Sequence, residues 1–157
     1  MKSLIKSFGY AFRGIFTALT KERNMRIHTV CMLYMYFFLF AFDFFEISGT
    51  QIAIIFLANA LVMGGELINT AIERAVDLCG DEHTENGKIA KDCAAGAVLV
   101  FAIFSVLCGI AIMYQPEAFA KMFAYFIANP IAIILFVISV VIFTIFIFKG
   151  FPKRKGK

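Results

Sequence analysis

The sequence predicts an all-α membrane protein with an N-terminal amphipathic surface helix, a three-span core and an additional fourth transmembrane helix. The chain has 157 residues, 61% of them hydrophobic, and a mean hydropathy of +0.84. A soluble domain of this size cannot bury so much apolar surface. Each of four apolar runs can cross a ~30 Å hydrocarbon core, which needs about 20 helical residues. They lie at approximately residues 27–45, 50–72, 93–114 and 130–148.

The placement of basic residues predicts the orientation in the membrane. Fourteen of the 15 Lys and Arg residues fall in the N-terminal segment, the 73–92 connection and the C-terminal tail, and Lys121 is the exception. An excess of positive charge marks the cytoplasmic side. We therefore expect four spans with both termini cytoplasmic, because three spans would place the basic tail outside. The mixed character of the segment before the first apolar run argues against a cleavable signal peptide.

The first expected element is an amphipathic helix over about residues 2–21 that lies in the membrane interface. Its apolar residues recur at helical spacing, and its basic side faces anionic headgroups. A simple membrane anchor would explain this pattern. However, Tyr10, Arg13 and Gly14 share the polar side, and Gly9 and Gly14 weaken a helix where Ala would serve better. Close approach of another group would explain the glycines.

Glu22 follows this helix and is the only acidic residue among the first 42. Its basic neighbours, Lys21 and Arg23, allow a surface salt bridge of little energetic value, and that interpretation stays open. The alternative is a functional carboxylate, because Glu22 lies at the same expected depth as Glu73, at the cytoplasmic edge of the membrane.

The end of the second apolar run carries a row of polar residues, namely Glu66, Asn69, Glu73 and Asp77. At ~3.6 residues per turn, separations of three, seven and eleven residues fall on one stripe of a helix. Ionisable groups on a membrane helix are costly, so a row of them indicates a functional site. Carboxylates in such a row can hold a divalent cation or accept a proton.

The polar connection at 78–92 leads into the third span. It carries several charged residues, but a charged loop is often only solvated, and His83 alone indicates little. Lys91 and Asp92 differ because they open the third span, where a lysine can reach a phosphate as a point charge. The small residues at 94–97 then allow close helix packing.

The fourth span carries almost no polar chemistry. Residues 131–148 have only Ser139 and Thr144 as polar side chains, and the linker at 115–129 is a weakly amphipathic piece with prolines as end signals. The chain has four cysteines without paired metal spacing, so we interpret them as small apolar residues.

Three sequence blocks, taken together, are typical of one family. They are Gly9-Tyr10 through residues 22–26, then the residues from Glu66 to Glu73 with Asp77, then Ala90-Lys91-Asp92 with Ala95 and residues 97–99. The central Glu-x-x-Asn-x-Ala-Ile-Glu-x-x-x-Asp pattern, at the end of a span, is highly specific. With these blocks, residues 8–114 resemble the small prokaryotic integral-membrane lipid kinases, the diacylglycerol kinase and undecaprenol kinase family.

The resemblance implies a membrane lipid kinase domain at residues 1–114, with the three-span kinase core. Residues 115–157 would add a connecting segment, the extra transmembrane helix and a basic cytoplasmic tail. Family members assemble as homotrimers with active sites between subunits. Carried onto this chain, the resemblance makes Glu66 the general base for the lipid hydroxyl and Asn69 the residue that orients it. The magnesium carboxylates, which also position ATP, are Glu22 and Glu73. The other expected nucleotide contacts are Tyr10, Asp77, Glu82, His83, Thr84, Lys91 and Asp92.

The expected acceptor is a membrane lipid alcohol, phosphorylated with ATP and Mg²⁺. Undecaprenol is favoured, because the stretches at 22–28 and 88–92 resemble the Gram-positive branch of the family. Diacylglycerol is the alternative acceptor, and a non-enzymatic membrane oligomer with a carboxylate ring is a less favoured reading. The resemblance also implies the plasma membrane of a bacterium and no nucleic-acid partner.

Overall fold

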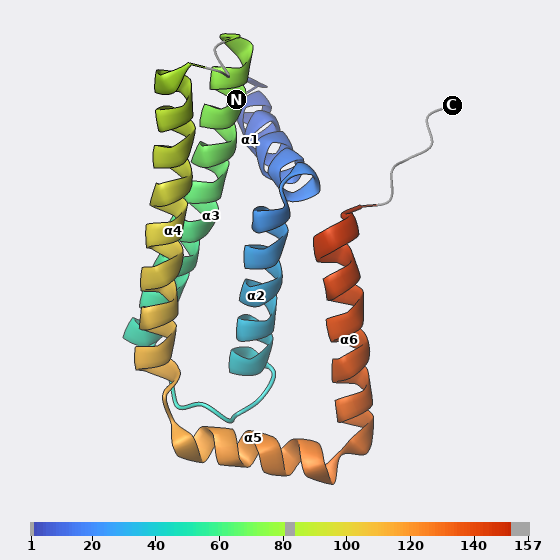
Figure 1. Ribbon diagram of the computed structural model, residues 1–157. Coiled ribbons are helices and arrows are strands. Elements are labelled where there is room, and N and C mark those ends of the chain that lie inside the picture. Colours follow the sequence, from blue (N-terminus) through green and yellow to red (C-terminus); the bar gives the residue numbers. More distant parts are fainter. Residues whose placement is uncertain (1, 81–83, 152–157) are drawn as a thin grey trace, which may run out of the picture.

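The computed structural model describes residues 2–80 and 84–151, and the regular elements within them are all α-helices. Figure 1 shows α2, α3, α4 and α6 running beside one another, while α5 lies across one end of them. The expected all-α fold is confirmed. The helices are α1 (Lys2–Lys21), α2 (Arg23–Phe40), α3 (Gly49–Leu78), α4 (Glu85–Met113), α5 (Pro116–Ala128) and α6 (Pro130–Lys149).

Three helices, α3, α4 and α6, are long and apolar enough to cross a membrane. They cover three of the four expected spans and extend further, so the polar ends of α3 and α4 are helical too. The first expected span, 27–45, falls mainly on α2, which ends at Phe40. The first turns of α2 carry Arg23, Arg26 and His28. These polar turns lower its hydropathy, and a crossing by α2 stays a prediction.

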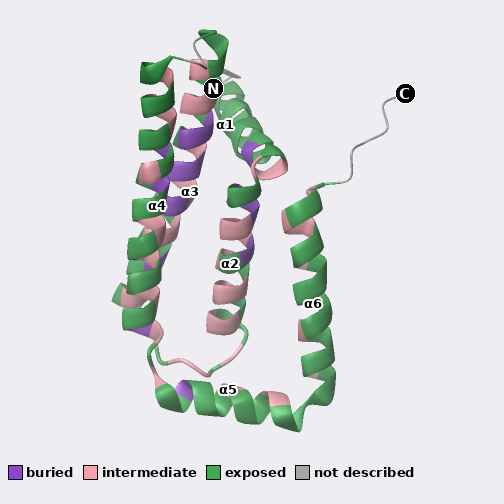
Figure 2. Ribbon diagram, viewed as in Figure 1, coloured by how far each residue is buried: buried purple, intermediate pink, exposed green. Residues whose placement is uncertain are grey.

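The most extensive packing joins α3 and α4, which form an antiparallel pair. Gly65 lies in this contact: a Cβ at this position would come within 2.8 Å of Cδ2 of Phe101. Any larger residue would therefore force α4 or the Phe101 ring to move. Figure 2 shows buried residues along α3 and α4 and at the junction of α1 with α2. Glu66 and Asn69, at one end of the polar row of α3, lie in the same buried region.

The chain breaks between α1 and α2 at Glu22, whose backbone is extended (φ −97°, ψ 123°). Just after the break, the guanidinium of Arg26, which is buried, donates from Nε to the carbonyl of Ile147 at 2.9 Å and from Nη1 to that of Thr20 at 3.0 Å. These carbonyls lie in the last turns of α6 and α1, where backbone acceptors lack helical partners. Arg26 therefore ties three helices together.

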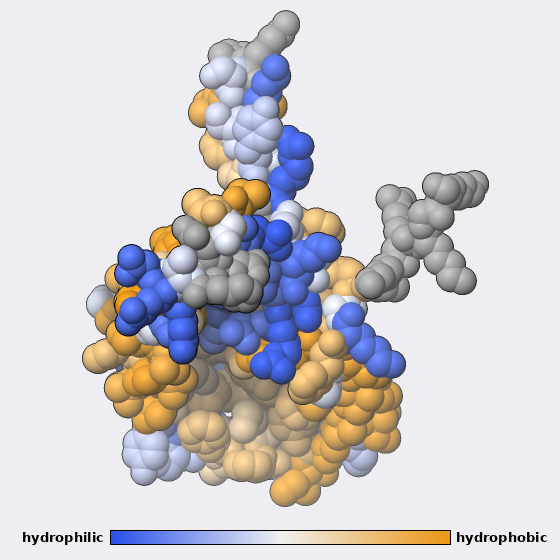
Figure 3. Space-filling view, turned by 45° about the horizontal axis from the view of Figure 1, so that its top comes forward, coloured by the Kyte–Doolittle hydropathy of each residue, from blue (hydrophilic) through white to orange (hydrophobic). Residues whose placement is uncertain are grey.

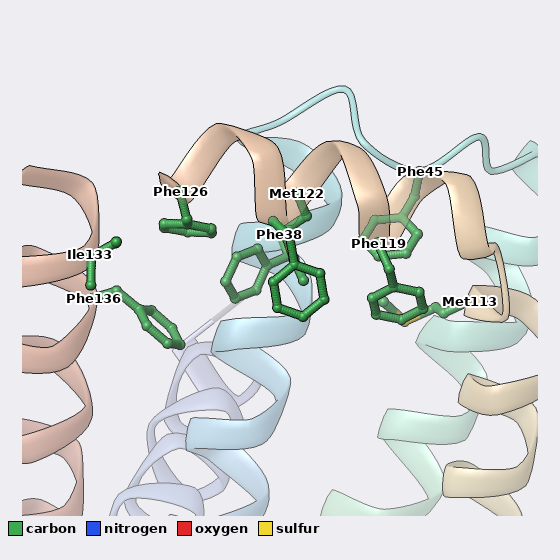
Figure 4. Close-up of a pocket in the computed structure, with 9 residues that line it drawn as sticks. Phe38, Phe45, Met113, Phe119, Met122, Phe126, Ile133 and Phe136 are labelled. Atoms are coloured by element: carbon green, nitrogen blue, oxygen red, sulfur yellow. The ribbon is translucent and has the colours of Figure 1, made fainter. Parts of the chain in front are cut away.

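The segment expected as a weakly amphipathic linker forms the helix α5. Between α5 and the adjoining ends of α2, α4 and α6 lies a pocket of about 400 Å³ (Figure 4). Its lining is aromatic and aliphatic and includes Phe38, Phe119, Met122 and Phe136. No lining residue is titratable, so the pocket offers no acid–base chemistry.

Candidate active site

The polar stripe of α3 runs from buried to exposed along the helix. Glu66 is 2% exposed and Asn69 is 9% exposed, whereas Glu73 is half-buried and Asp77 lies on the surface. Seven residues separate the two glutamates, which corresponds to about 10 Å along the axis. The predicted stripe therefore exists, and it places carboxylates at different depths.

Glu66 faces His28 of α2. The separation between Oε1 of Glu66 and Nε2 of His28 is 3.4 Å, within the range of an ion pair but longer than a typical hydrogen bond. Within the described residues, this carboxylate oxygen is buried without a hydrogen-bond partner. Hydrogen bonds of catalytic groups are often long before substrate binds. Glu66 is thus a buried carboxylate whose acceptor capacity is not used up.

Asn69 contacts Glu73 and not the carboxylate of Glu66, which we expected it to orient. Its Nδ2 donates to Oε1 of Glu73 at 3.0 Å, one turn along the helix. Its own carbonyl oxygen, Oδ1, is buried and has no hydrogen-bond partner within the described chain. Asn69 therefore orients the half-buried carboxylate and leaves one hard acceptor free.

Glu22 approaches α3 from the break between α1 and α2. Its Oε1 lies 3.7 Å from Nη2 of Arg74, the residue after Glu73. The ion pair therefore crosses between helices and does not involve the adjacent Lys21 or Arg23. Since the Arg74 side chain is 56% exposed, this pair is worth little on its own.

The residues present fit a magnesium ion bound together with substrate phosphates. Within residues 2–80 and 84–151, no group of three or more His, Cys, Asp or Glu side chains could hold a metal by itself. Magnesium commonly takes only one or two protein carboxylates plus substrate phosphates and water. Glu22, Glu73 and the unpartnered Oδ1 of Asn69 are hard oxygen donors of the type that it prefers.

Asp77 and Lys91 form an ion pair between the polar ends of α3 and α4. Asp92 follows on the exposed side of α4. Figure 3 shows hydrophilic residues gathered over this end of the molecule, with a hydrophobic surface below them. This polar end is where a water-soluble nucleotide can approach the stripe of α3.

The other expected nucleotide contacts are spread over this end. Tyr10 of α1 is 63% exposed, and the guanidinium of Arg13 lies 4.9 Å from its ring centre. Thr84 caps α4 by accepting a hydrogen bond from the backbone of Gly87. Glu82 and His83 lie outside the described residues. A Cβ at Gly9 or Gly14 would meet nothing within 4 Å among the described residues, so none of them makes the close approach expected there.

The sequence reasoning did not single out His28 or Arg26. Both lie in the 22–28 stretch, which contributed to the family resemblance and to the choice of its branch without a role for either residue. Periodicity gave no signal for them, because most residues from 20 to 29 are polar. What the sequence could not provide was the register of α2 against α3.

Comparison with known proteins identifies the family. The profile described as prokaryotic diacylglycerol kinase matches residues 9–113. A diacylglycerol kinase of Synechocystis is 41% identical over 115 residues, which are 73% of this chain and 64% of that protein. An undecaprenol kinase of Bacillus subtilis is 41% identical over 114 residues, 71% of this chain and 89% of the relative. The diacylglycerol kinase of Escherichia coli is 32% identical over 104 residues, 66% of this chain and 83% of the relative.

The profile match covers the helices that carry the stripe, the break at Glu22 and the Asp77–Lys91 ion pair, and it ends just before α5 begins. No solved structure gives a significant match. The chain spans about two thirds of the Synechocystis relative, at 64% of its length. The matching profile covers well over half of this chain, which confirms the resemblance noted in its sequence. The protein belongs to the prokaryotic diacylglycerol kinase family, a family of lipid kinases.

Proposed function

We propose that the protein transfers the γ-phosphoryl group of ATP to the hydroxyl of a membrane lipid alcohol, and that undecaprenol is the preferred acceptor. The observation that carries the proposal is the stripe of α3, on which a buried carboxylate lies about two turns from a half-buried one. The depth difference of roughly 10 Å suits a reaction between a water-soluble nucleotide and a lipid headgroup. Family membership excludes the non-enzymatic reading of the carboxylates.

In this proposal Glu66 accepts the proton of the lipid hydroxyl. Glu22 and Glu73 hold magnesium, which neutralises charge on the phosphates when it is bound. Asn69 fixes the Glu73 carboxylate through its amide. Phosphoryl transfer needs positioning and charge neutralisation more than covalent chemistry, so two carboxylates and a base are a sufficient set of protein groups.

The nucleotide contacts in this proposal are Tyr10, Asp77, Glu82, His83, Thr84, Lys91 and Asp92. Lys91 is the strongest basic candidate for a phosphate, although its ammonium pairs with Asp77 here. A lysine can exchange one acceptor for another without rearranging a planar group. ATP phosphates would then compete with Asp77 for the same ammonium.

Undecaprenol is preferred over diacylglycerol because of the 22–28 and 88–92 stretches. The two relatives at 41% identity divide between these substrates, and the undecaprenol kinase is matched over more of its length, at 89% against 64%. Diacylglycerol is the second candidate because the Synechocystis relative carries that name.

We further propose that the chain forms homotrimers in the bacterial plasma membrane with both termini cytoplasmic. A Cβ at Gly9 or Gly14 would meet no described residue within 4 Å, which leaves room for a group from another subunit or for the nucleotide. The basic residues collect at the termini and at 73–92, as the cytoplasmic side requires.

The test is phosphoryl transfer from labelled ATP by the purified, detergent-solubilised protein, with magnesium and either undecaprenol or diacylglycerol. We expect transfer to both lipids to require magnesium, with the higher kcat/KM for undecaprenol. A preference for diacylglycerol would select the second candidate. Absence of transfer to either lipid, in a preparation that still binds ATP, would reject the proposed function.

A further inference from the structure

His28 is the titratable group that the α2 helix presents to the buried end of the stripe. Its side chain is 25% exposed, whereas that of Glu66 is 3% exposed. The other ion pairs of this region have different members: Arg74 pairs with Glu22, and Lys91 pairs with Asp77. At the adjacent Gly65, α3 meets the apolar side chains of Val98 and Phe101 on α4.

A proton accepted by the buried Glu66 carboxylate needs a route out of the protein. A carboxylate removed from water that accepts a proton must return it before the next turnover, and a buried ionised group without a partner is costly. Glu73 is separated from Glu66 by two turns and is occupied by Asn69. Among the described residues, His28 is the titratable side chain paired with the Glu66 carboxylate, and it is itself partly exposed, so it can pass a proton on.

We propose that His28 is a positioning residue for Glu66 and carries the proton of the lipid hydroxyl from Glu66 to water. This inference rests on the proposed function. As the lipid O–H bond breaks, the lipid oxygen bonds to the γ-phosphorus, the proton goes to Glu66, and the bond to the β,γ-bridging oxygen breaks with its electron pair left on ADP. The proton then passes from Glu66 to Nε2 of neutral His28 and from the imidazolium to water, which restores the carboxylate.

The competing explanation is that His28 only holds α2 against α3. The interface offers a matched contact for this comparison, since Nδ2 of Asn59 on α3 donates to the hydroxyl of Tyr36 on α2 at 3.0 Å. Tyr36→Phe removes an α2–α3 hydrogen bond without touching the stripe. A structural role for His28 predicts similar effects of His28→Gln and Tyr36→Phe, whereas proton transfer predicts a kinetic defect in His28→Gln alone.

The first experiment measures kcat, the KM for ATP and the solvent deuterium isotope effect for the wild type, His28→Gln and Tyr36→Phe. Loss of an acid–base group typically lowers the rate about 10²–10⁴-fold. Because His28 acts through Glu66, we expect kcat of His28→Gln to fall about 10²-fold with a larger isotope effect and an unchanged KM for ATP. Tyr36→Phe should remain close to the wild type. A wild-type kcat in His28→Gln, or loss of ATP binding in that variant, would overturn the proposal.

The second experiment uses His28→Ala, which leaves space beside Glu66, with added imidazole or pyrazole. The two rings have similar shapes, but only imidazole accepts a proton near neutral pH. We expect imidazole to restore turnover at least about tenfold and pyrazole to have no effect. Equal responses to the two compounds, whether both restore turnover or neither does, would exclude a proton-carrying role. If the wild-type protein phosphorylated neither lipid, the proposed function itself would be rejected. The His28 variants cannot produce that result, because it is measured on the wild type.

Discussion

The acidic residues of α3 differ chiefly in how far each is removed from water. Glu66 is buried, Glu73 is half-buried beside Asn69, and Asp77 lies on the surface beside Lys91. Burial suits a base that acts on a lipid hydroxyl, and partial exposure suits a ligand for magnesium and phosphates. The same residue type is therefore suited to different roles by its depth along one helix.

Glu66→Gln tests the role of the buried carboxylate. The amide keeps the shape of the side chain but cannot take a proton, so we expect kcat to fall about 10²–10⁴-fold. Binding of magnesium-ATP should stay near the wild-type level, because Glu66 lies about 10 Å from Glu73. Turnover and nucleotide affinity are measured on the same preparation. Near-normal turnover would remove Glu66 from its role as base.

Glu22→Gln and Glu73→Gln test the proposed shared metal site. Each change should weaken magnesium-ATP binding, and the double variant should lose less than the sum of the single losses, because both act on one ion. Isothermal titration at several magnesium concentrations measures these affinities. Glu117→Gln on α5 is a matched control that should change nothing, since Glu117 is exposed at the other end of the bundle.

Arg74→Gln separates the metal role of Glu22 from its salt bridge. If Glu22 served only to pair with Arg74, at 3.7 Å, then Arg74→Gln would reproduce the effect of Glu22→Gln. We expect Arg74→Gln to bind magnesium-ATP with nearly wild-type affinity, because exposed pairs contribute little. Equal defects in the two variants would favour the salt bridge.

The stripe of α3 could be predicted from the sequence because it depends only on spacing within one helix. Its pairing with α2 could not, because a contact such as His28–Glu66 depends on how two helices are aligned. The contact of Asn69 with Glu73 illustrates the same limit on a smaller scale. Glu66 and Glu73 each lie about one turn from Asn69, so spacing alone allows a hydrogen bond to either carboxylate. The side-chain rotamers determine which one forms.

At the scale of elements, α6 is joined to α2 at two depths. Arg26 donates to the last turn of α6, and the hydroxyls of Tyr34 and Ser139 lie 2.8 Å apart farther along. The sequence predicted α6 from its hydropathy but not this docking, because the acceptor of Arg26 is a backbone carbonyl that carries no sequence signal. The helix α5 was likewise expected only as a linker, since its pattern is weak.

Arg26→Met should destabilise the fold more than Arg23→Met. Arg26 is 6% exposed and bonds two helix ends, whereas Arg23 is exposed. Hydrogen bonds of charged groups contribute about 1.5–3 kcal/mol each, so we expect a clear loss of stability for Arg26→Met and little change for Arg23→Met. Thermal unfolding in one detergent measures both. Equal stabilities would mean that the guanidinium does not clamp the three helices.

At the scale of the whole molecule, the C-terminal end of the described chain meets the junction of α1 with α2. A Cβ at Gly150 would lie 3.4 Å from Nη1 of Arg26, and the rings of Phe16 and Phe151 are 5.8 Å apart. An even number of crossings brings both termini to one side. We expect reporters fused before Met1 and after Lys157 to be cytoplasmic, and one inserted after Gln115 to be outside. An external reporter after Lys157 would contradict the four-span topology.

The truncation of residues 130–157 tests where the chemistry resides. The removed helix has Ser139 and Thr144 as its polar side chains, and Ser139 is occupied by Tyr34. The family match also ends before α5. We therefore expect magnesium-dependent kinase activity to remain measurable, although stability should fall because Arg26 loses the carbonyl of Ile147.

Full-length Arg26→Met is the control for this truncation, because it loses the hydrogen bond to Ile147, together with that to Thr20, while it keeps α6 and the basic tail. If the truncated protein and Arg26→Met lose similar stability, the loss belongs to the clamp and not to the lipid site. The truncated protein must be folded, inserted and of confirmed oligomeric state. If such a protein bound ATP normally but phosphorylated neither lipid, part of the lipid site would lie on α6. The apolar surface of α6 would then contact the acceptor chain at the pocket beside α5.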